Sequence, residues 1–100
     1  MSSLPWFVQK YQGSDPEFFP LIKEIVEKAM NPEELDEKTK YLIVLALDAS
    51  KGAFQGVKVV AEQAREAGAS EKEIRETLRL AYFVSGMDIV KTSLNAFPAD

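Results

Sequence analysis

Residues 41–47 read Tyr-Leu-Ile-Val-Leu-Ala-Leu and form the longest uninterrupted apolar stretch of the chain. This stretch is far shorter than the roughly 20 residues that a membrane-spanning helix needs, so we expect it to be buried within protein. Polar flanks at residues 38–40 and 48–50 extend the segment with no turn signal before Gly52, and this length favours a helix over the competing strand. Because a helix that is apolar on every side is buried on every side, residues 36–51 are predicted to form the central helix.

Other segments of the chain also carry helix signals. Residues 20–30 form an amphipathic pattern that Asn31-Pro32 ends, and residues 53–67 repeat apolar side chains at the three-four spacing of a helix. Gly68 is well placed as a carboxy-terminal cap. A capping box at residues 70–73 opens a fourth helix, and the residues after Gly86 supply a fifth. No segment alternates apolar and polar residues convincingly, so we predict an all-α fold of about five helices.

The first residues are predicted to stand apart from this helical body. Residues 1–14 form an N-terminal arm in our prediction, and residues 15–100 form the helical domain, opened by the helix-start signature Asp15-Pro16-Glu17. The arm carries sizeable apolar side chains, which docking on the body or on a neighbouring subunit would bury: Leu4, Trp6, Phe7, Val8 and Tyr11.

Composition excludes several classes of function. The chain of 100 residues is long enough for one domain, and it contains no cysteine and no histidine. We therefore expect no disulfide, no thiolate nucleophile, no metal site and no cofactor. The net charge of −4 argues against a nucleic-acid partner, which requires a concentrated positive surface. Residues 1–5 lack the basic and apolar regions of a secretory signal, so we expect a cytoplasmic protein with no membrane partner.

Three pieces of the sequence resemble a known family. The pieces are residues 35–46, the helix-to-helix junction at residues 67–74, and Gly86 after residues 81–85. Their order and spacing are similar to those of the carboxymuconolactone decarboxylase / AhpD-like family. The resemblance covers about residues 35–97. It implies an AhpD-like helical domain, and because members of this family usually assemble as dimers, trimers or hexamers, it implies a homo-oligomer.

The resemblance also identifies the positions at which relatives carry their chemistry. Redox members have a glutamate in the central helix, a Cys-x-x-Cys pair at the start of the next helix and a histidine one turn later. Counting back from Gly68, these positions fall on Tyr41, Ala53, Gly56 and Val60. Decarboxylating members have a similar scaffold, with arginine, glutamate and histidine around the start of the same helix. At these positions this chain again has Ala53, Gly56 and Val60. Alanine, glycine and valine can neither attack a disulfide nor move a proton. We therefore expect neither chemistry.

A different set of residues remains as an alternative site. Tyr41 and Asp48 lie seven residues apart on one side of the central helix, with Lys51 nearby, and this cluster could perform acid–base work in an enzyme of unknown reaction. Glycine inside a helix costs about 1 kcal/mol relative to alanine, so Gly56 indicates a packing or functional reason. The space beside it either is filled by core side chains or holds a small molecule, and Met87 could line the same space.

The favoured hypothesis is a non-redox carboxymuconolactone decarboxylase-like protein that acts as an oligomeric binding or structural module, a homo-oligomer from dimer to hexamer. A small-molecule ligand remains open in this hypothesis. The alternative is the acid–base enzyme.

Overall fold

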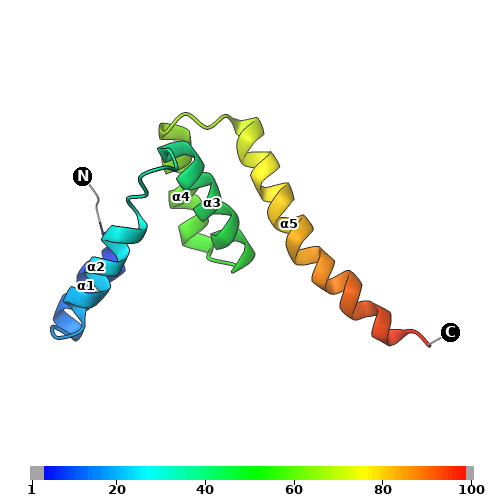
Figure 1. Cartoon of the computed structure of the whole chain (residues 1–100), viewed down its shortest axis with the longest axis horizontal. Helices are drawn as coiled ribbons and strands as arrows, with labels where there is room; N and C mark the ends of the chain where they lie inside the picture. The colour runs from blue at the N-terminus through cyan, green and yellow to red at the C-terminus, as the bar shows by residue number, and fades with distance from the viewer. Residues whose placement is uncertain (1–3, 99–100) are drawn as a thin grey trace. The chain divides into compact units, whose positions relative to one another are not determined.

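The computed structural model describes residues 4–98, which are helical, with no strand among them (Figure 1). The prediction of an all-α fold is therefore confirmed. The chain divides into two compact units, the first ending at Asp36 and the second beginning at Glu37.

The first unit is a pair of helices, α1 (Trp6–Ser14) and α2 (Phe19–Ala29), that pack on each other. Val8 and Phe19 are its buried apolar residues. Most of the segment predicted as an arm thus forms a helix of its own. Pro20 lies in the first turn of α2, where a backbone N–H has no helical acceptor, so proline removes no hydrogen bond there. The observed start of α2, Phe19, differs from the predicted start by a single residue.

The second unit consists of α3 (Glu37–Ser50), α4 (Phe54–Glu66), α5 (Glu71–Ser93) and a short 3₁₀ turn, η1 (Leu94–Ala96). α3 packs against both α4 and α5, and the fully buried Leu45 of α3 lies in the core with four residues from α4, α5 and the turn between them. These residues are Val60, Ala64, Ala69 and Ile74.

The prediction that α3 is buried on every side is not met within the second unit. Ile43 is 44% exposed and Leu47 is 58% exposed. α4 and α5 are the elements of the second unit that pack on α3, so they cover only part of its apolar surface.

Two glycines end helices in the second unit. Gly52 has φ +70° and Gly68 has φ +101°, the left-handed region that a side chain disfavours. The N–H of Ala53 donates to the carbonyl of Asp48 (2.9 Å), and the N–H of Ala69 donates to the carbonyl of Ala64 (2.9 Å). Both turns are therefore Schellman motifs, and the predicted cap at Gly68 is confirmed.

The predicted capping box at the start of α5 is also present. The N–H of Glu73 donates to Oγ of Ser70 (3.0 Å), and the N–H of Ser70 donates to Oε1 of Glu73 (2.9 Å). Lys38 of α3 donates to the other carboxylate oxygen of Glu73 (3.0 Å), and Arg65 of α4 binds Glu71 through Nε (2.7 Å). The hydrogen bonds to Glu73 from Ser70 and then from Lys38 hold the pKa of its carboxyl below the ordinary value. These contacts tie the start of α5 to both neighbouring helices.

The predicted break at Gly86 is wrong, because α5 runs through it without interruption to Ser93. A single glycine weakens a helix by about 1 kcal/mol but does not end it unless the backbone turns left-handed or a proline follows. Residues 70–85 and 87–97, predicted as two helices, therefore belong mainly to one. The C-terminal half of α5 extends past α3 and α4 (Figure 1).

Candidate functional site

The turn between α3 and α4 brings Asp48 against the first turn of α4. A Cβ atom added to Gly56 would lie 2.7 Å from Oδ2 of Asp48 and 3.3 Å from its Cγ. The half-buried Asp48 carboxylate therefore takes the space that a side chain at position 56 would need. Ala53, the residue before α4, is also beside this space, since its Cβ would lie 3.5 Å from the added atom.

This position explains how a carboxylate is accommodated at the end of α3. A negative charge at a helix C-terminus is unfavourable, but the positive end of the α4 dipole faces the same carboxylate. Val57 is the first residue of α4 whose N–H finds a helical acceptor, the carbonyl of Ala53 (2.9 Å). The N–H groups before it are the partly positive groups of the helix end. Asp48 and Gly56 thus pack together, because the absence of a side chain at Gly56 leaves room for the carboxylate of Asp48.

The four positions implied by the family resemblance lie in two surroundings. Val60 belongs to the hydrophobic core, and Tyr41 is half-buried and packs against it. Ala53 and Gly56 lie at the start of α4 beside Asp48. Position 60, which the resemblance matches to a histidine of redox relatives, is therefore enclosed by apolar side chains. Position 56, which the resemblance matches to a cysteine, faces the carboxylate of Asp48.

Tyr41 has a charged neighbour other than the predicted Asp48. The ammonium of Lys40 lies 4.5 Å from the centre of the Tyr41 ring and donates to Oε1 of Glu37 (2.9 Å). Asp48 is two turns further along α3, about 10 Å away along the helix axis. The structure thus shows Tyr41 packing beside Lys40, while Asp48 packs beside Gly56.

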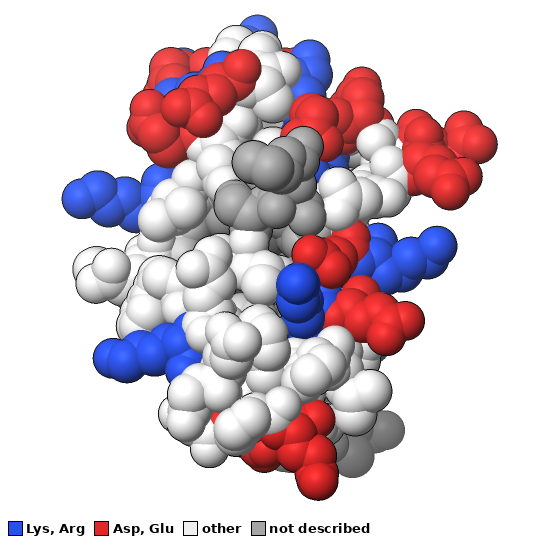
Figure 2. Space-filling view, turned by 90° about the vertical axis from the view of Figure 1, so that its left-hand side faces the viewer, with Lys and Arg blue, Asp and Glu red and all other residues white. Residues whose placement is uncertain are grey.

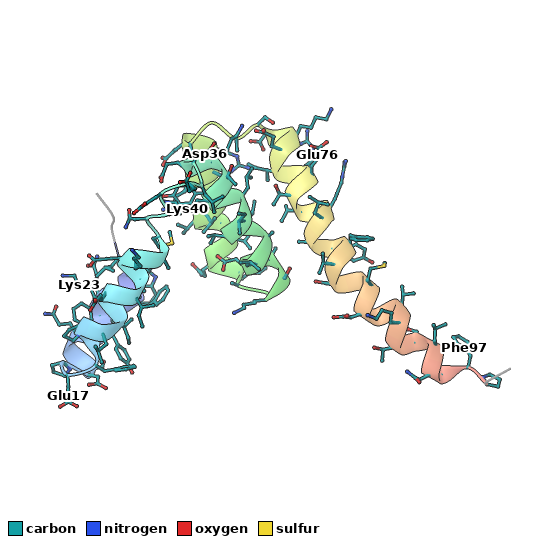
Figure 3. The ribbon with its side chains drawn as sticks, in the orientation of Figure 1. Glu17, Lys23, Asp36, Lys40, Glu76 and Phe97 are labelled. Atoms are coloured by element: carbon teal, nitrogen blue, oxygen red, sulfur yellow. The ribbon has the colours of Figure 1, made fainter. Side chains whose placement is uncertain are left out.

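Lys40 is a residue that the sequence reasoning missed. It is 8% exposed, and it lies near the start of α3 (Figure 3). Burial by itself lowers the pKa of the Lys40 ammonium, but the hydrogen bond to Glu37 and the nearby Tyr41 outweigh burial and raise the pKa above its ordinary value. The signal in the sequence was Glu37 three residues earlier, a spacing at which a carboxylate and an ammonium meet on one helix face.

The remaining residues of the predicted pocket lie in different elements. Lys51 is exposed in the turn after α3, and Met87 is 40% exposed in the C-terminal half of α5. Two open depressions of the surface lie on α5. One is lined by Asp88, Ile89, Thr92 and Ser93, and the other by Arg75, Leu78, Arg79 and Tyr82. The grouping of Tyr41, Asp48, Lys51, Gly56 and Met87 in a ligand pocket stays a prediction.

Two features are absent from residues 4–98. No group of three or more histidine, cysteine, aspartate or glutamate side chains is placed to hold a metal ion. Within the same residues, no helix combines the length and the apolar character that crossing a membrane requires.

Comparison with known proteins identifies one family. The model of the carboxymuconolactone decarboxylase family matches residues 16–98. A relative described as uncharacterized protein MJ1511, from Methanocaldococcus jannaschii, is 31% identical over 72 residues, which cover 72% of this chain and 67% of the relative. No solved structure matches the chain.

Proposed function

Because the chain belongs to the carboxymuconolactone decarboxylase family, we propose that it is a non-redox member that acts as an oligomeric binding or structural module. The observation that carries the proposal is the contact between Asp48 and Gly56, where an added Cβ would lie 2.7 Å from the carboxylate. Redox relatives place the second thiol of a Cys-x-x-Cys pair at this position. In this chain the space belongs to a carboxylate, and the chain contains no cysteine and no histidine.

Exposed apolar surface supports the oligomeric part of the proposal. Monomeric soluble proteins rarely expose large contiguous apolar patches. Large apolar side chains are exposed on every helix, including Trp6 of α1, Leu21 of α2, Leu47 of α3, Phe54 of α4 and Leu94 after α5. Figure 2 shows uncharged residues over much of this view, with acidic and basic side chains among them. Association of subunits would remove such surface from water.

Light scattering on the purified protein tests the oligomer directly. At micromolar concentration we expect a mass between that of a dimer and that of a hexamer. A monomer over this range would contradict the proposal, because the exposed apolar side chains would then have no partner.

An activity assay tests the non-redox part. With peroxide or a small disulfide as substrate and a dithiol as reductant, we expect turnover no faster than in buffer, since each reaction needs a thiolate nucleophile. Turnover that rises with protein concentration and survives removal of contaminating proteins would contradict the proposal. A crystal structure with a metabolite held by Tyr41, Asp48 and Lys51 would instead favour the acid–base enzyme.

A further inference from the structure

The C-terminal half of α5, together with Leu94 at the start of η1, carries a regular apolar pattern that packing within the second unit does not use. Leu80, Phe83, Met87, Val90 and Leu94 follow one another at spacings of three, four, three and four residues, and we call this set the seam. Each of the five is 40% to 68% exposed. Alternating spacings of three and four are the heptad pattern by which one helix packs along another.

The seam lies on the opposite side of α5 from the residues that pack in the core. Ile74 is buried in the core cluster and Leu78 packs against it. At 3.6 residues per turn, the centre of the seam is rotated roughly 180° from the face that these two residues define. The seam therefore points away from α3 and α4, and it continues toward Phe97, which Figure 3 labels at the far end of the helix. Intramolecular packing in the second unit leaves the seam uncovered.

The length of the seam restricts what can cover it. From Leu80 to Leu94 it spans fifteen residues, whereas α3, the next longest helix of the described residues, has fourteen residues in all and buries Leu45 against its own subunit. α5 has twenty-three residues and presents a free apolar face of the required length. The helix that matches the seam is therefore α5 of a second copy, and two identical seams form a self-complementary contact about a two-fold axis.

Side-chain volumes favour an antiparallel arrangement. In antiparallel register, Phe83 of one chain faces Leu94 of the other and Met87 faces Val90, so that each layer combines a larger and a smaller side chain. A parallel pair would instead place Phe83 against its own copy and Val90 against its own copy, one layer overfilled and another underfilled.

Area and charge are compatible with this contact. The exposed fractions of the seam residues correspond to roughly 600 Å² per chain. A contact that covered all of this surface would bury about 1,200 Å² on two chains, the lower end of stable interfaces. The seam contains no charged residue, and the positions beside it include the small Gly86 and Ser93, which permit close approach of two helices. Arg79 and Lys91 are cations among these flanking positions, and their long side chains can extend to water.

We propose that the seams of two copies of this chain pack antiparallel and form the primary contact of the oligomer. This inference rests on the proposed oligomeric function and adds which face makes the contact and in which direction the helices run.

Two neighbouring β-branched residues provide a matched test of the face. Val90 is in the seam and is 55% exposed, whereas Ile89 is 68% exposed and lies outside the seam. A glutamate at position 90 would place a charge in the contact on both chains, so Val90→Glu is expected to raise the Kd of self-association by about 30-fold or more. Ile89→Glu is expected to change the Kd by less than about threefold. Sedimentation velocity over a concentration series measures both, and circular dichroism verifies that each variant remains helical.

The outcomes separate this inference from the proposed function. A wild-type monomer would overturn both. A wild-type oligomer that Val90→Glu leaves intact, or that Ile89→Glu weakens equally, would overturn the seam contact alone and indicate that another exposed apolar face joins the subunits.

Cysteine cross-linking tests the direction, and the absence of natural cysteine makes the signal unambiguous. An equimolar mixture of Phe83→Cys and Leu94→Cys chains, one carrying a size tag, is expected to form a mixed disulfide dimer under mild oxidation. Thr92→Cys, an exposed position on the opposite side of the helix, replaces Leu94→Cys in the control and is expected to give less than about a tenth of that product. Efficient cross-linking of Phe83→Cys to itself, with little mixed product, would establish parallel helices and overturn the proposed direction.

Discussion

Replacing Gly56 with alanine tests the contact on which the proposed function depends. The added Cβ would lie 2.7 Å from Oδ2 of Asp48, so the carboxylate has to move. Alanine gains up to about 1 kcal/mol over glycine through helix propensity, whereas moving the carboxylate away from the positive end of α4 loses about 0.3–1 kcal/mol. The two effects oppose each other. We therefore expect Gly56→Ala to change the free energy of unfolding by less than about 0.5 kcal/mol.

The same substitution should behave differently once the carboxylate is removed. In an Asp48→Ala background nothing obstructs the new methyl group, and Gly56→Ala is expected to stabilise the protein by up to about 1 kcal/mol. The double-mutant cycle should thus give a coupling free energy of about 0.3–1 kcal/mol. Urea denaturation followed by circular dichroism measures all four proteins, at one fixed protein concentration because association contributes to stability.

Gly13 provides the control for this cycle. No heavy atom lies within 4 Å of a Cβ added there, so Gly13→Ala should have the same effect with and without Asp48. If the effects of Gly56→Ala and Asp48→Ala add within about 0.3 kcal/mol, the carboxylate does not occupy the space over α4 and the reasoning fails.

Three further predictions concern the packing of the second unit. Ser70→Ala removes the cap of α5 and should lower the free energy of unfolding by about 1 kcal/mol in urea denaturation, with an unchanged urea midpoint counting against the cap. The pKa of Glu73 is lowered in the folded state, so the stability that its carboxylate contributes is complete above the unfolded pKa and is lost as the pH falls through the folded pKa. The urea midpoint should therefore drop as acid is added, and it should drop less steeply in Lys38→Met. Equal pH dependence of the urea midpoint in the two proteins would contradict this prediction. Leu45→Ala should destabilise by about 2–5 kcal/mol, while exposed Leu47→Ala should cost less than about 1 kcal/mol, and equal effects in thermal melts would contradict the observed core.

Local chemistry made much of the fold predictable from sequence. The cap at Gly68 and the box formed by Ser70 and Glu73 depend on residues within one turn of each other, and both are present as predicted. The continuity of α5 through Gly86 was not predictable in the same way, because a helical glycine and a helix-ending glycine differ in backbone angles that the residue type does not determine. α1 was missed as a helix although Phe7, Val8 and Tyr11 lie at helical spacings of three and four residues. The segment is short and turn-forming residues flank it, and these features favoured an arm in the prediction.

The candidate site was harder to predict than the fold because its neighbours come from different helices. The expected partner of Asp48 was another residue of its own helix, but the turn at Gly52 brings α4 to it instead. Burial of Lys40 was equally hidden, since lysine is almost never fully buried unless it is paired. Exposure of Ile43 and Leu47 depends on what packs outside the chain, which no pattern within the sequence specifies.

The contact between Asp48 and position 56 bears on the proposal that this chain lacks the thiol chemistry of redox relatives. A cysteine at position 56 would begin with a Cβ within 2.7 Å of the carboxylate oxygen, so either the thiol or the aspartate would have to leave its place. If both remained near each other, the negative charge would raise the pKa of the thiol and suppress the thiolate that performs the reaction. Restoring cysteines at positions 53 and 56 alone would therefore leave a poor nucleophile, because the aspartate that fits the glycine is the wrong neighbour for a thiolate.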